Sequence, residues 1–247
     1  MTRDAFLGGR LTLSQPRNGF RAGLDSVLLG AAAPAGGTAL LDLGAGAGAA
    51  GLTALALGRT DRADLAERDP AMQALARNNV DENGFSGRAS VLEVDITARA
   101  DARRAAGLMD NRFDTVIANP PFFAARRGTP APIASRAEAR HMEAEALELW
   151  VRCAAASAAA GGMAIFIYPA PGLAALLAAF DRRFGALHLL PLAPRPGMEA
   201  MRILIRGRKG SRAPLTLMAT RFLHDDAGHG FAPEFEAIFR GQAALDW

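Results

Sequence analysis

Four short apolar segments that each end in a polar residue set the strongest limit on how this chain can fold. Helix-like or turn-like segments separate them, and the polar residues at their ends are Asp42, Glu67, Asp95 and Asn119. Strands that alternate with helices predict a mostly parallel sheet with helices on both faces. Ligands of such sheets bind beyond the carboxyl ends of the strands. We therefore expect these four side chains to line one crevice.

Apolar periodicity and the positions of glycine and proline predict the remaining elements. Strands are expected at 10–14, 39–43, 63–66, 90–94, 113–118, 163–168, 186–192, 201–206 and 215–219, and helices at 26–33, 49–57, 70–83, 97–106, 147–160, 173–184 and 233–240. A long loop is expected at 123–140. The short connection 207–214 predicts that the last two strands form an antiparallel pair.

Length and composition bound the function without identifying it. The 247 residues suffice for one large domain, and 28 basic against 25 acidic residues give a net charge of +3, too small to indicate nucleic-acid binding by itself. The lone cysteine, Cys153, excludes an internal disulfide and favours a reducing, cytoplasmic compartment. We expect it in the core. The first 20 residues do not resemble a signal peptide. The uncharged stretch 153–180 contains glycines and prolines, so we expect a helix end, a strand and a new helix there rather than a membrane span.

A glycine-rich loop follows the strand at 39–43. It contains G-x-G-x-x-G from Gly46 to Gly51, and Glu67 follows at roughly the 20-residue spacing of a ribose-binding acid. One interpretation is a dinucleotide-dependent oxidoreductase. However, the Asp42 charge at the mouth of the loop would repel a pyrophosphate. A cationic ligand without phosphates, such as S-adenosylmethionine, is tolerated there, with Glu67 for its ribose and Asp95 for its adenine amine.

A stiff turn, Asn119-Pro120-Pro121-Phe122, follows the strand at 113–118. Neither proline can donate a ladder hydrogen bond, and each restricts the residue before it. The turn presents two acceptors, the Asn119 side-chain carbonyl and the Pro120 backbone carbonyl, beside the flat Phe122 ring. That combination suits a planar amine, as on a nucleobase or an amide.

Together these residues resemble a class I S-adenosylmethionine-dependent methyltransferase, and the turn resembles its amino-group methylating branch. Within that branch the sequence is similar to the bacterial family of tRNA valine anticodon-loop adenine N6-methyltransferases. The resemblance runs from about Leu11 to Arg240. It rests on Gly19-Phe20-Arg21, Asp25-Ser26-Val27-Leu28-Leu29-Gly30, Asp42-Leu43-Gly44-Ala45-Gly46, Glu67, Val94-Asp95-Ile96, Asn119-Pro120-Pro121-Phe122-Phe123, Ala139-Arg140, Arg208-Lys209-Gly210 and Phe231-Ala232-Pro233-Glu234.

The resemblance implies an α/β fold: a Rossmann-like, mostly parallel seven-stranded sheet with helices on both faces and an antiparallel C-terminal strand pair. It implies a single methyltransferase domain over 1–247, in which 1–34 is an N-terminal extension covering the cofactor site and 35–247 is the core. The implied cofactor-binding residues are Arg21, Asp42, Leu43, Gly44, Gly46, Glu67, Asp95, Ile96 and Asn119, with Gly44 and Gly46 near the methionine part. The implied catalytic residues are Asn119, Pro120, Pro121 and Phe122.

Several alternatives stay open. Phe122 departs from the tyrosine that the nearest family favours, so the target could be an amine of an rRNA base (adenine N6 or guanine N2) as well as adenine N6 in tRNA. A glutamine side-chain amide in a release factor, or a non-catalytic binding role, is also compatible with the turn. RNA contacts are expected in two basic loops, 123–140 and 195–212, through Arg126, Arg127, Arg136, Arg140, Arg195, Arg202, Arg206, Arg208, Lys209 and Arg212. His224 and His229 with Asp225 and Asp226 match no metal-site spacing, and we expect no metal.

Overall fold

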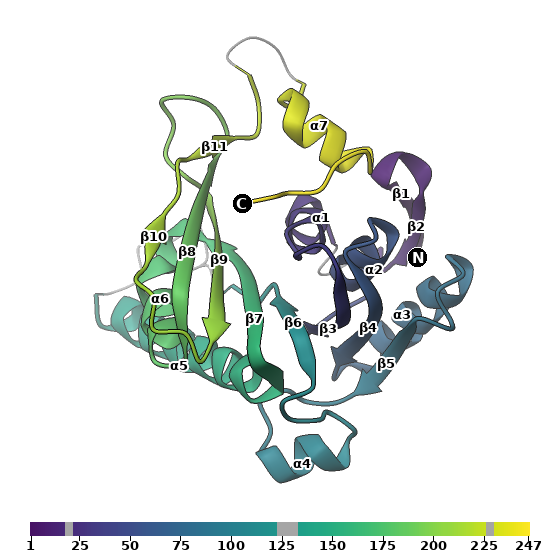
Figure 1. The fold of residues 1–247 in the computed structure, drawn as a ribbon, viewed down its shortest axis with the longest axis horizontal. Coiled ribbons are helices and arrows are strands. Elements are labelled where there is room, and N and C mark those ends of the chain that lie inside the picture. The colour runs from purple at the N-terminus through teal and green to yellow at the C-terminus, as the bar shows by residue number, and fades with distance from the viewer. Residues whose placement is uncertain (18–21, 123–132, 226–229) are drawn as a thin grey trace.

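A twisted central sheet organises the protein (Figure 1). The computed structural model describes residues 1–17, 22–122, 133–225 and 230–247, and for 133–141 and 143 only the backbone. In this part of the chain the strand order is β10-β8-β9-β7-β6-β3-β4-β5, with β11 paired to β8, which makes nine strands. The strands are β3 (Gly37–Leu43), β4 (Thr60–Glu67), β5 (Ala89–Glu93), β6 (Phe113–Ala118), β7 (Ala158–Pro169), β8 (Phe184–Ala193), β9 (Arg202–Lys209), β10 (Thr216–Leu217) and β11 (Arg221–Phe222).

Helices cover both faces of this sheet. They are α1 (Leu24–Ala31), α2 (Ala49–Ala56), α3 (Pro70–Glu82), α4 (Ala100–Ala105), α5 (Ile133–Ser157), α6 (Leu173–Asp181) and α7 (Pro233–Phe239), with single 3₁₀ turns η1 (Leu7–Gly9) and η2 (Ala170–Gly172). A separate antiparallel hairpin, β1 (Thr2–Phe6) and β2 (Leu11–Gln15), precedes them. No helix within the described ranges combines the length and hydropathy that a bilayer span needs.

The sheet confirms the predicted fold class. Strands β3 to β7 pair in parallel, whereas β9 is antiparallel to both β7 and β8. The seven longer strands, β3 to β9, make up the seven-stranded mostly parallel sheet, and β8 with β9 is the antiparallel pair near the C-terminus. The fold is therefore α/β with helices on both faces.

The predicted partner of the last antiparallel strand was wrong. Residues 215–219 were expected to pair with 201–206, but Thr216–Leu217 lies parallel to β8, with Thr216 opposite His188. Both edges of β9 are already occupied by β7 and β8, so the following segment has only the outer edge of β8 available. The unpaired backbone groups along the outer edge of β8, rather than the short connection 207–214, therefore determine this pairing.

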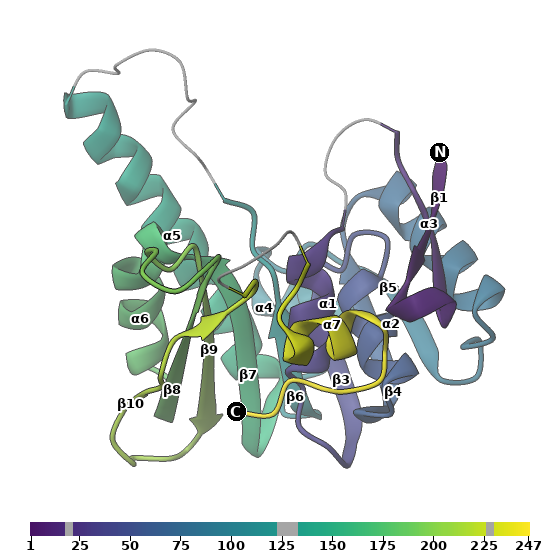
Figure 2. The same ribbon diagram turned by 90° about the horizontal axis from the view of Figure 1, so that it is seen from above.

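The elements around α5 also differ from the prediction. The 123–140 loop ends earlier, because α5 begins at Ile133, and α5 stops at Ser157 rather than at Gly161-Gly162. The first turns of α5 contain good helix formers such as alanine, arginine and glutamate but no apolar stripe to reveal them. At the other end, Ala158 is drawn into β7 opposite Phe113. Figure 2 shows that the first half of α5 projects beyond the sheet.

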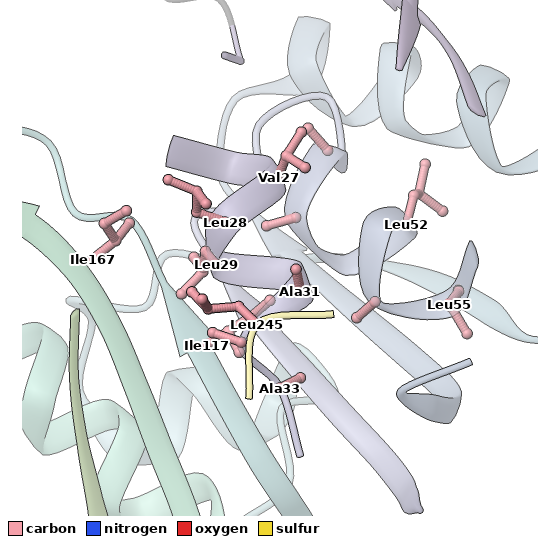
Figure 3. Packing of buried hydrophobic residues seen from close by; sticks show 14 of the residues in the cluster. Val27, Leu28, Leu29, Ala31, Ala33, Leu52, Leu55, Ile117, Ile167 and Leu245 are labelled. Carbon is pink, nitrogen blue, oxygen red and sulfur yellow. The ribbon is translucent and has the colours of Figure 1, made fainter. Parts of the chain in front are cut away.

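Two hydrophobic cores lie on the two faces of the sheet. Helices α1, α2 and α3 and the C-terminal segment cover one face, and α5 and α6 cover the other, where Cys153 is fully buried as expected. Helix α1 packs beside α2 on this face, α1 over β6 and β7 and α2 over β3 and β4, with the tail residue Leu245 near α1 (Figure 3). Gly30 permits this crossing, since a Cβ there would lie 2.4 Å from the Ala50 carbonyl oxygen.

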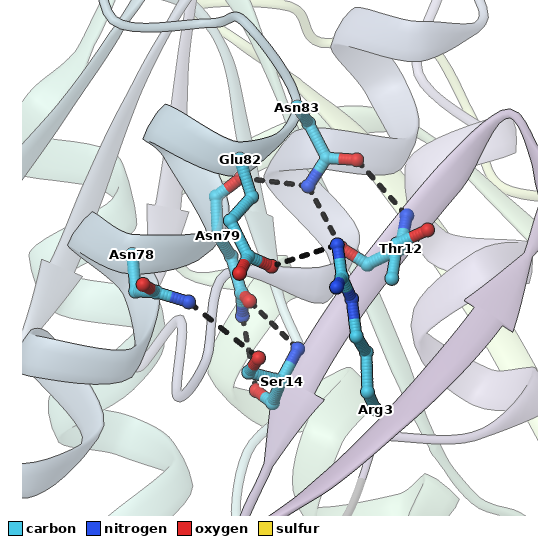
Figure 4. A network of polar contacts seen from close by, with 7 residues as sticks. All are labelled: Arg3, Thr12, Ser14, Asn78, Asn79, Glu82 and Asn83. Carbon is cyan, nitrogen blue, oxygen red and sulfur yellow. Dashed lines mark hydrogen bonds and ion pairs between the residues drawn. The ribbon is translucent and has the colours of Figure 1, made fainter.

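Side-chain amides of α3 hold the N-terminal hairpin (Figure 4). Asn79 accepts from the Ser14 N–H at 2.7 Å and donates to the Ser14 carbonyl at 3.1 Å. Asn83, one helical turn later, makes the same two bonds with Thr12. These amides therefore satisfy the backbone of β2 as a neighbouring strand would. Asn79 also donates to the Ala47 carbonyl at 2.9 Å, which ties the hairpin to the glycine-rich loop.

We expect Asn79→Ala to lower the free energy of unfolding by about 3 kcal/mol, because it leaves buried backbone groups of Ser14 and Ala47 without partners. In a chain of this size that corresponds to a melting temperature roughly 6–12 °C lower. Calorimetry of the purified variant measures it. Asn78→Ala is the matched control, since Asn78 is exposed and its one contact with the Ser14 hydroxyl is 3.5 Å long. Equal melting temperatures for the two variants would contradict this role of Asn79.

Candidate active site at the carboxyl edge of the sheet

The carboxyl ends of β3, β4, β5 and β6 lie at one edge of the sheet. Leu43 is opposite both Ala66 and Ala118, and Glu67 is opposite Glu93, so the four strands end in register. Asp42, Glu67, Asp95 and Asn119 are therefore all at or just past this edge. Leu43 and Ile96 are buried in the core beneath it.

Asp42 is the buried carboxylate beneath the glycine-rich loop. Only 2% of its surface is exposed, and its Oδ2 accepts a 2.8 Å hydrogen bond from the Gly51 N–H at the start of α2. Burial raises the pKa of Asp42 to about 7; the Gly51 hydrogen bond lowers it, and the nearby Glu67 charge raises it further. Near neutral pH this side chain is balanced between its charged and neutral forms.

The raised pKa of Asp42 predicts a stability that falls as the pH rises. In the unfolded chain the carboxyl loses its proton near pH 4, whereas the folded protein retains that proton up to about pH 7. Its contribution is therefore complete below pH 4 and lost by about pH 7. We expect Asp42→Asn, which keeps an oxygen for Gly51, to remove this part of the pH dependence. Urea unfolding of both proteins at pH 4.5 and 7.5 measures the difference, and parallel changes would refute the prediction.

Glu67 at the end of β4 is connected to the glycine-rich loop. Its Oε2 accepts from the Gly46 N–H at 2.8 Å, and its Oε1 accepts from the N–H groups of Arg68 and Asp69 at 2.8 and 2.9 Å. Three donors thus fill most of the roughly four lone-pair positions of a carboxylate. A ligand hydroxyl can take the remaining position, or replace Gly46.

Asp95 lies beyond β5 at the same edge. Its Oδ1 accepts from the N–H and the hydroxyl of Thr97, at 2.9 and 2.6 Å, and its Oδ2 lies 3.7 Å from Arg68. Burial alone would raise the pKa of Asp95, but the Thr97 hydrogen bonds and the Arg68 charge lower it below its ordinary value. Asp95 is therefore ionised at neutral pH and remains an acceptor.

The turn after β6 brings an amide and an aromatic ring to the edge. Asn119 is half-buried, Pro120 is buried, and Pro121 and Phe122 are exposed, with 43% of Phe122 accessible. The Phe122 ring meets Tyr168 at the end of β7, with ring centroids 5.9 Å apart and planes at 87°. This edge-to-face contact with a fully buried ring supports the exposed phenylalanine.

A pocket opens between the glycine-rich loop and the N-terminal segment. Of the predicted site residues, Asp42, Gly44 and Asn119 line it, whereas Gly46, Glu67 and Asp95 lie outside its lining. Gly44 has φ +63°, and a Cβ there would lie 2.3 Å from the Trp150 ring of α5, so only glycine fits between α5 and the pocket. The full lining is Gln15, Pro16, Ala22, Ser26, Asp42, Gly44, Ala45, Ala47, Ala50, Met72 and Asn119.

The N-terminal segment was expected to cover the site, but the residues of 1–34 that line this pocket, Gln15, Pro16, Ala22 and Ser26, were not named as site residues. Gln15 is 1% exposed, accepts from the Ala22 N–H at 2.7 Å and donates to Asp4 at 2.9 Å, which ties Ala22 and Asp4 to the end of β2. Ser26 lines the pocket from the first turn of α1, whose N-cap is Gly23. The polar, glycine-marked stretch 15–25 was the available signal.

The chemistry of this pocket fits a cation better than a phosphate. Its described lining includes the carboxyl of Asp42 and no lysine or arginine, and Glu67 and Asp95 add acceptors along the same edge. The backbone at Gly46, with φ +57°, leaves open space where a Cβ would stand. These residues fit S-adenosylmethionine, whose sulfonium is positive, and disfavour a pyrophosphate-containing dinucleotide.

Some predicted residues fall outside the described chain. Arg21, Arg126 and Arg127 lie outside the described residues. Arg136 and Arg140 are described only by their backbone. His229 and Asp226 are likewise outside the described part. Within the described residues no group of three or more histidine, cysteine, aspartate or glutamate side chains could hold a metal ion.

The second basic region does not form one loop. Strand β9 occupies Arg202–Lys209, so the basic side chains of 195–212 are distributed between opposite edges of the sheet. Arg202 pairs with Asp25 at 2.8 Å at the carboxyl edge. At the other end of β9, Lys209 donates to Asn111 and to the Ala158 carbonyl, both at 2.8 Å. The prediction that 195–212 forms a single loop was wrong, because β9 carries the two ends of this segment to opposite edges of the sheet.

Comparison with known proteins assigns the family. The family model of the methyltransferase small domain matches residues 25–146. A tRNA1(Val) (adenine(37)-N6)-methyltransferase of Porphyromonas gingivalis is 31% identical over 95% of this chain and 93% of its own, and one of Klebsiella pneumoniae is 34% identical over 57% of this chain and 55% of its own. A solved structure from Agrobacterium tumefaciens, described as a predicted O-methyltransferase, is 36% identical with a TM-score of 0.76, covering 90% of this chain and 99% of that one. The chain therefore belongs to the family of tRNA1(Val) (adenine(37)-N6)-methyltransferases.

Proposed function

We propose that this protein transfers a methyl group from S-adenosylmethionine to the exocyclic N6 of an adenine in tRNA. The observation that carries the proposal is the position of Asn119, which lines the pocket of the glycine-rich loop at the mouth of the edge where Phe122 is exposed. The relatives that match along almost the whole chain are named for this reaction.

The cofactor would lie along the ends of β3, β4 and β5. When bound, it supplies an electrophilic methyl group on a positively charged sulfur. We assign Glu67 to the ribose hydroxyls and Asp95, next to the buried Ile96, to the adenine. Asp42 and Leu43 hold the loop from below, Gly44 and Gly46 give the methionine part access to the backbone, and Arg21 is proposed to close over the site.

Asn119 and Pro120 would act directly on the target amine. An aromatic amine is a weak nucleophile, because its lone pair is delocalised into the ring. Two hydrogen bonds, to the Asn119 side-chain carbonyl and the Pro120 backbone carbonyl, favour a tetrahedral nitrogen and stabilise the positive charge that develops during attack. Pro121 stiffens the turn, and Phe122 stacks on the base, a contact worth about 1–3 kcal/mol. Most of the remaining rate enhancement would come from orientation.

An amine fits this turn better than a hydroxyl. The Agrobacterium tumefaciens relative is described as a predicted O-methyltransferase, and a hydroxyl substrate has one proton to donate and requires a base to remove it. The Asn119 amide is not a base, and the turn offers two acceptors where a hydroxyl uses one. An exocyclic amine uses both.

We also propose that the chain is one functional unit. Residues 1–34 would form an extension over the cofactor site of the 35–247 core, supported by the pocket wall that Gln15, Pro16, Ala22 and Ser26 provide. RNA would approach the exposed Phe122 side, next to α5 and the segment 123–132 that leads to it.

The test is transfer of a labelled methyl group from S-adenosylmethionine to bulk tRNA, rRNA and a purified release factor. We expect label in tRNA, recovered as N6-methyladenosine after nuclease digestion. Label only in rRNA, as N6-methyladenosine or N2-methylguanosine, would keep the reaction and change the substrate. Label only on glutamine of the protein would overturn the proposal.

A further inference from the structure

Four of the exposed large hydrophobic side chains lie along one half of the carboxyl edge. Among the described residues, Leu24, Phe122, Met198 and Met201 are each 42–55% exposed. The ends of β3, β4 and β5 form the other half, with Asp42, Glu67 and Asp95. The edge is thus divided into an acidic, glycine-rich half and an apolar half, and Asn119 lies at the boundary. We refer to Leu24, Phe122, Met198 and Met201 as the apolar ridge.

Contacts made by neighbouring strand ends place Phe122 and Met201 along the same edge. Phe122 touches Tyr168 of β7, and Tyr168 is opposite Ile203 of β9. Two residues before Ile203, the Met201 carbonyl accepts from the Ala170 N–H at 3.1 Å, and its N–H donates to the Leu192 carbonyl at 2.9 Å.

The other two members lie near residues 201 and 202 by chain connection and by an ion pair. Met198 belongs to the turn between β8 and β9, where its N–H donates to the Arg195 carbonyl at 3.1 Å. Leu24 adjoins Asp25, which pairs with Arg202 at 2.8 Å. The ridge therefore follows the ends of β6, β7, β9 and β8 in the order in which those strands lie in the sheet.

We infer that the apolar ridge binds the unpaired nucleotides that adjoin the target base in an RNA strand. This inference rests on the proposed function. A base that reaches Asn119 must leave its stack, so its neighbours pass beside the site unpaired. The cofactor half occupies one direction along the edge, which leaves the ridge as the path for the strand.

Dimensions agree with this path. Neighbouring strands lie about 4.8 Å apart, which places the ends of β9 and β8 roughly 10 and 15 Å from the end of β6. A stacked strand advances about 3.4 Å per nucleotide, so these distances correspond to about three to four nucleotides next to the target. Flexible methionine side chains adapt to base faces of different shape.

The local charges neither attract nor exclude the strand strongly. Arg195 donates to the Asp225 carbonyl and Arg202 pairs with Asp25, while the exposed Glu199 adds a negative charge in the same turn. Recognition by the ridge would therefore be carried mainly by stacking and apolar contact, and would respond weakly to salt.

The test is the double variant Met198→Ser with Met201→Ser, assayed for methyl transfer to the RNA that the wild-type protein methylates. We expect KM for RNA to rise by at least about tenfold, with kcat changed far less and the dissociation constant for S-adenosylmethionine unchanged. Met109→Ser is the matched control, because Met109 is 49% exposed but lies just before β6, at the opposite edge of the sheet. Its KM should equal that of the wild type.

Other outcomes separate this inference from the proposed function. An unchanged KM in the double variant, while wild-type protein methylates tRNA, would overturn the ridge and leave the function intact. A shift from dimer to monomer in sedimentation, with KM unchanged, would assign the ridge to a second copy of this chain and likewise overturn it. Failure of the wild-type protein to methylate any RNA would overturn the function itself.

Discussion

Replacement of Asn119 by alanine is expected to reduce methyl transfer several hundred-fold while cofactor binding is retained. The side chain is half-buried at the end of β6 and lines the pocket. Its carbonyl would accept one of the two protons of the target amine, and that bond strengthens as the nitrogen becomes positive. Removing one such preorganised group from a site typically costs about 10²–10³ in rate. Because the bond forms chiefly in the transition state, kcat should fall much more than KM rises.

Asn119→Asp is the graded control for that experiment. Aspartate has nearly the same shape and keeps an acceptor oxygen, so it should retain more activity than alanine. Single-turnover transfer to tRNA measures the chemical step, and calorimetry measures S-adenosylmethionine binding, which should equal that of the wild type in both variants. Near-normal turnover of Asn119→Ala would remove Asn119 from the mechanism. Loss of cofactor binding would reassign it to the cofactor site.

The parts of the fold that could be predicted are those whose energetics are local. The short apolar runs within β3, β4 and β6 and the glycine loop are visible in the sequence, because burial on both faces of a parallel strand favours a mainly hydrophobic segment. The pairing of Thr216–Leu217 with β8 was not predictable, since it depends on which sheet edges earlier strands had already occupied. The start of α5 was missed because its first turns have no apolar stripe.

The same distinction holds at the site. Asp42, Glu67, Asp95 and Asn119 could be placed together because each follows a strand, and parallel strands end at one edge. Gln15 and Asn79 could not be identified, since a buried amide has no sequence signature. Their contribution to stability comes from hydrogen bonds to backbone groups distant in the chain, such as those of Ser14 and Ala47 for Asn79. Tertiary hydrogen bonding of this kind becomes visible only in the folded structure.

Replacement of Glu67 by glutamine is expected to weaken S-adenosylmethionine binding by about 10–100-fold, the cost of losing a hydrogen bond to a charged group and leaving a donor unpaired. In the folded protein both carboxylate oxygens accept from backbone N–H groups, of Gly46 on one side and of Arg68 and Asp69 on the other. Glutamine turns one of these oxygens into an NH₂ group that faces an N–H donor. The loop at Gly46 is then held less firmly, and a ribose hydroxyl loses its charged acceptor.

Glu93→Gln is the matched control for Glu67→Gln, since Glu93 is opposite Glu67 at the end of β5 but exposed. Titration calorimetry should give a wild-type dissociation constant for Glu93→Gln and a weaker one for Glu67→Gln. At saturating cofactor, kcat of Glu67→Gln should return close to the wild-type value, because this carboxylate holds the cofactor equally before and during transfer. That recovery distinguishes Glu67 from Asn119, whose loss no concentration of cofactor restores. An unchanged dissociation constant would exclude Glu67 from the ribose site and leave it only the support of the glycine-rich loop.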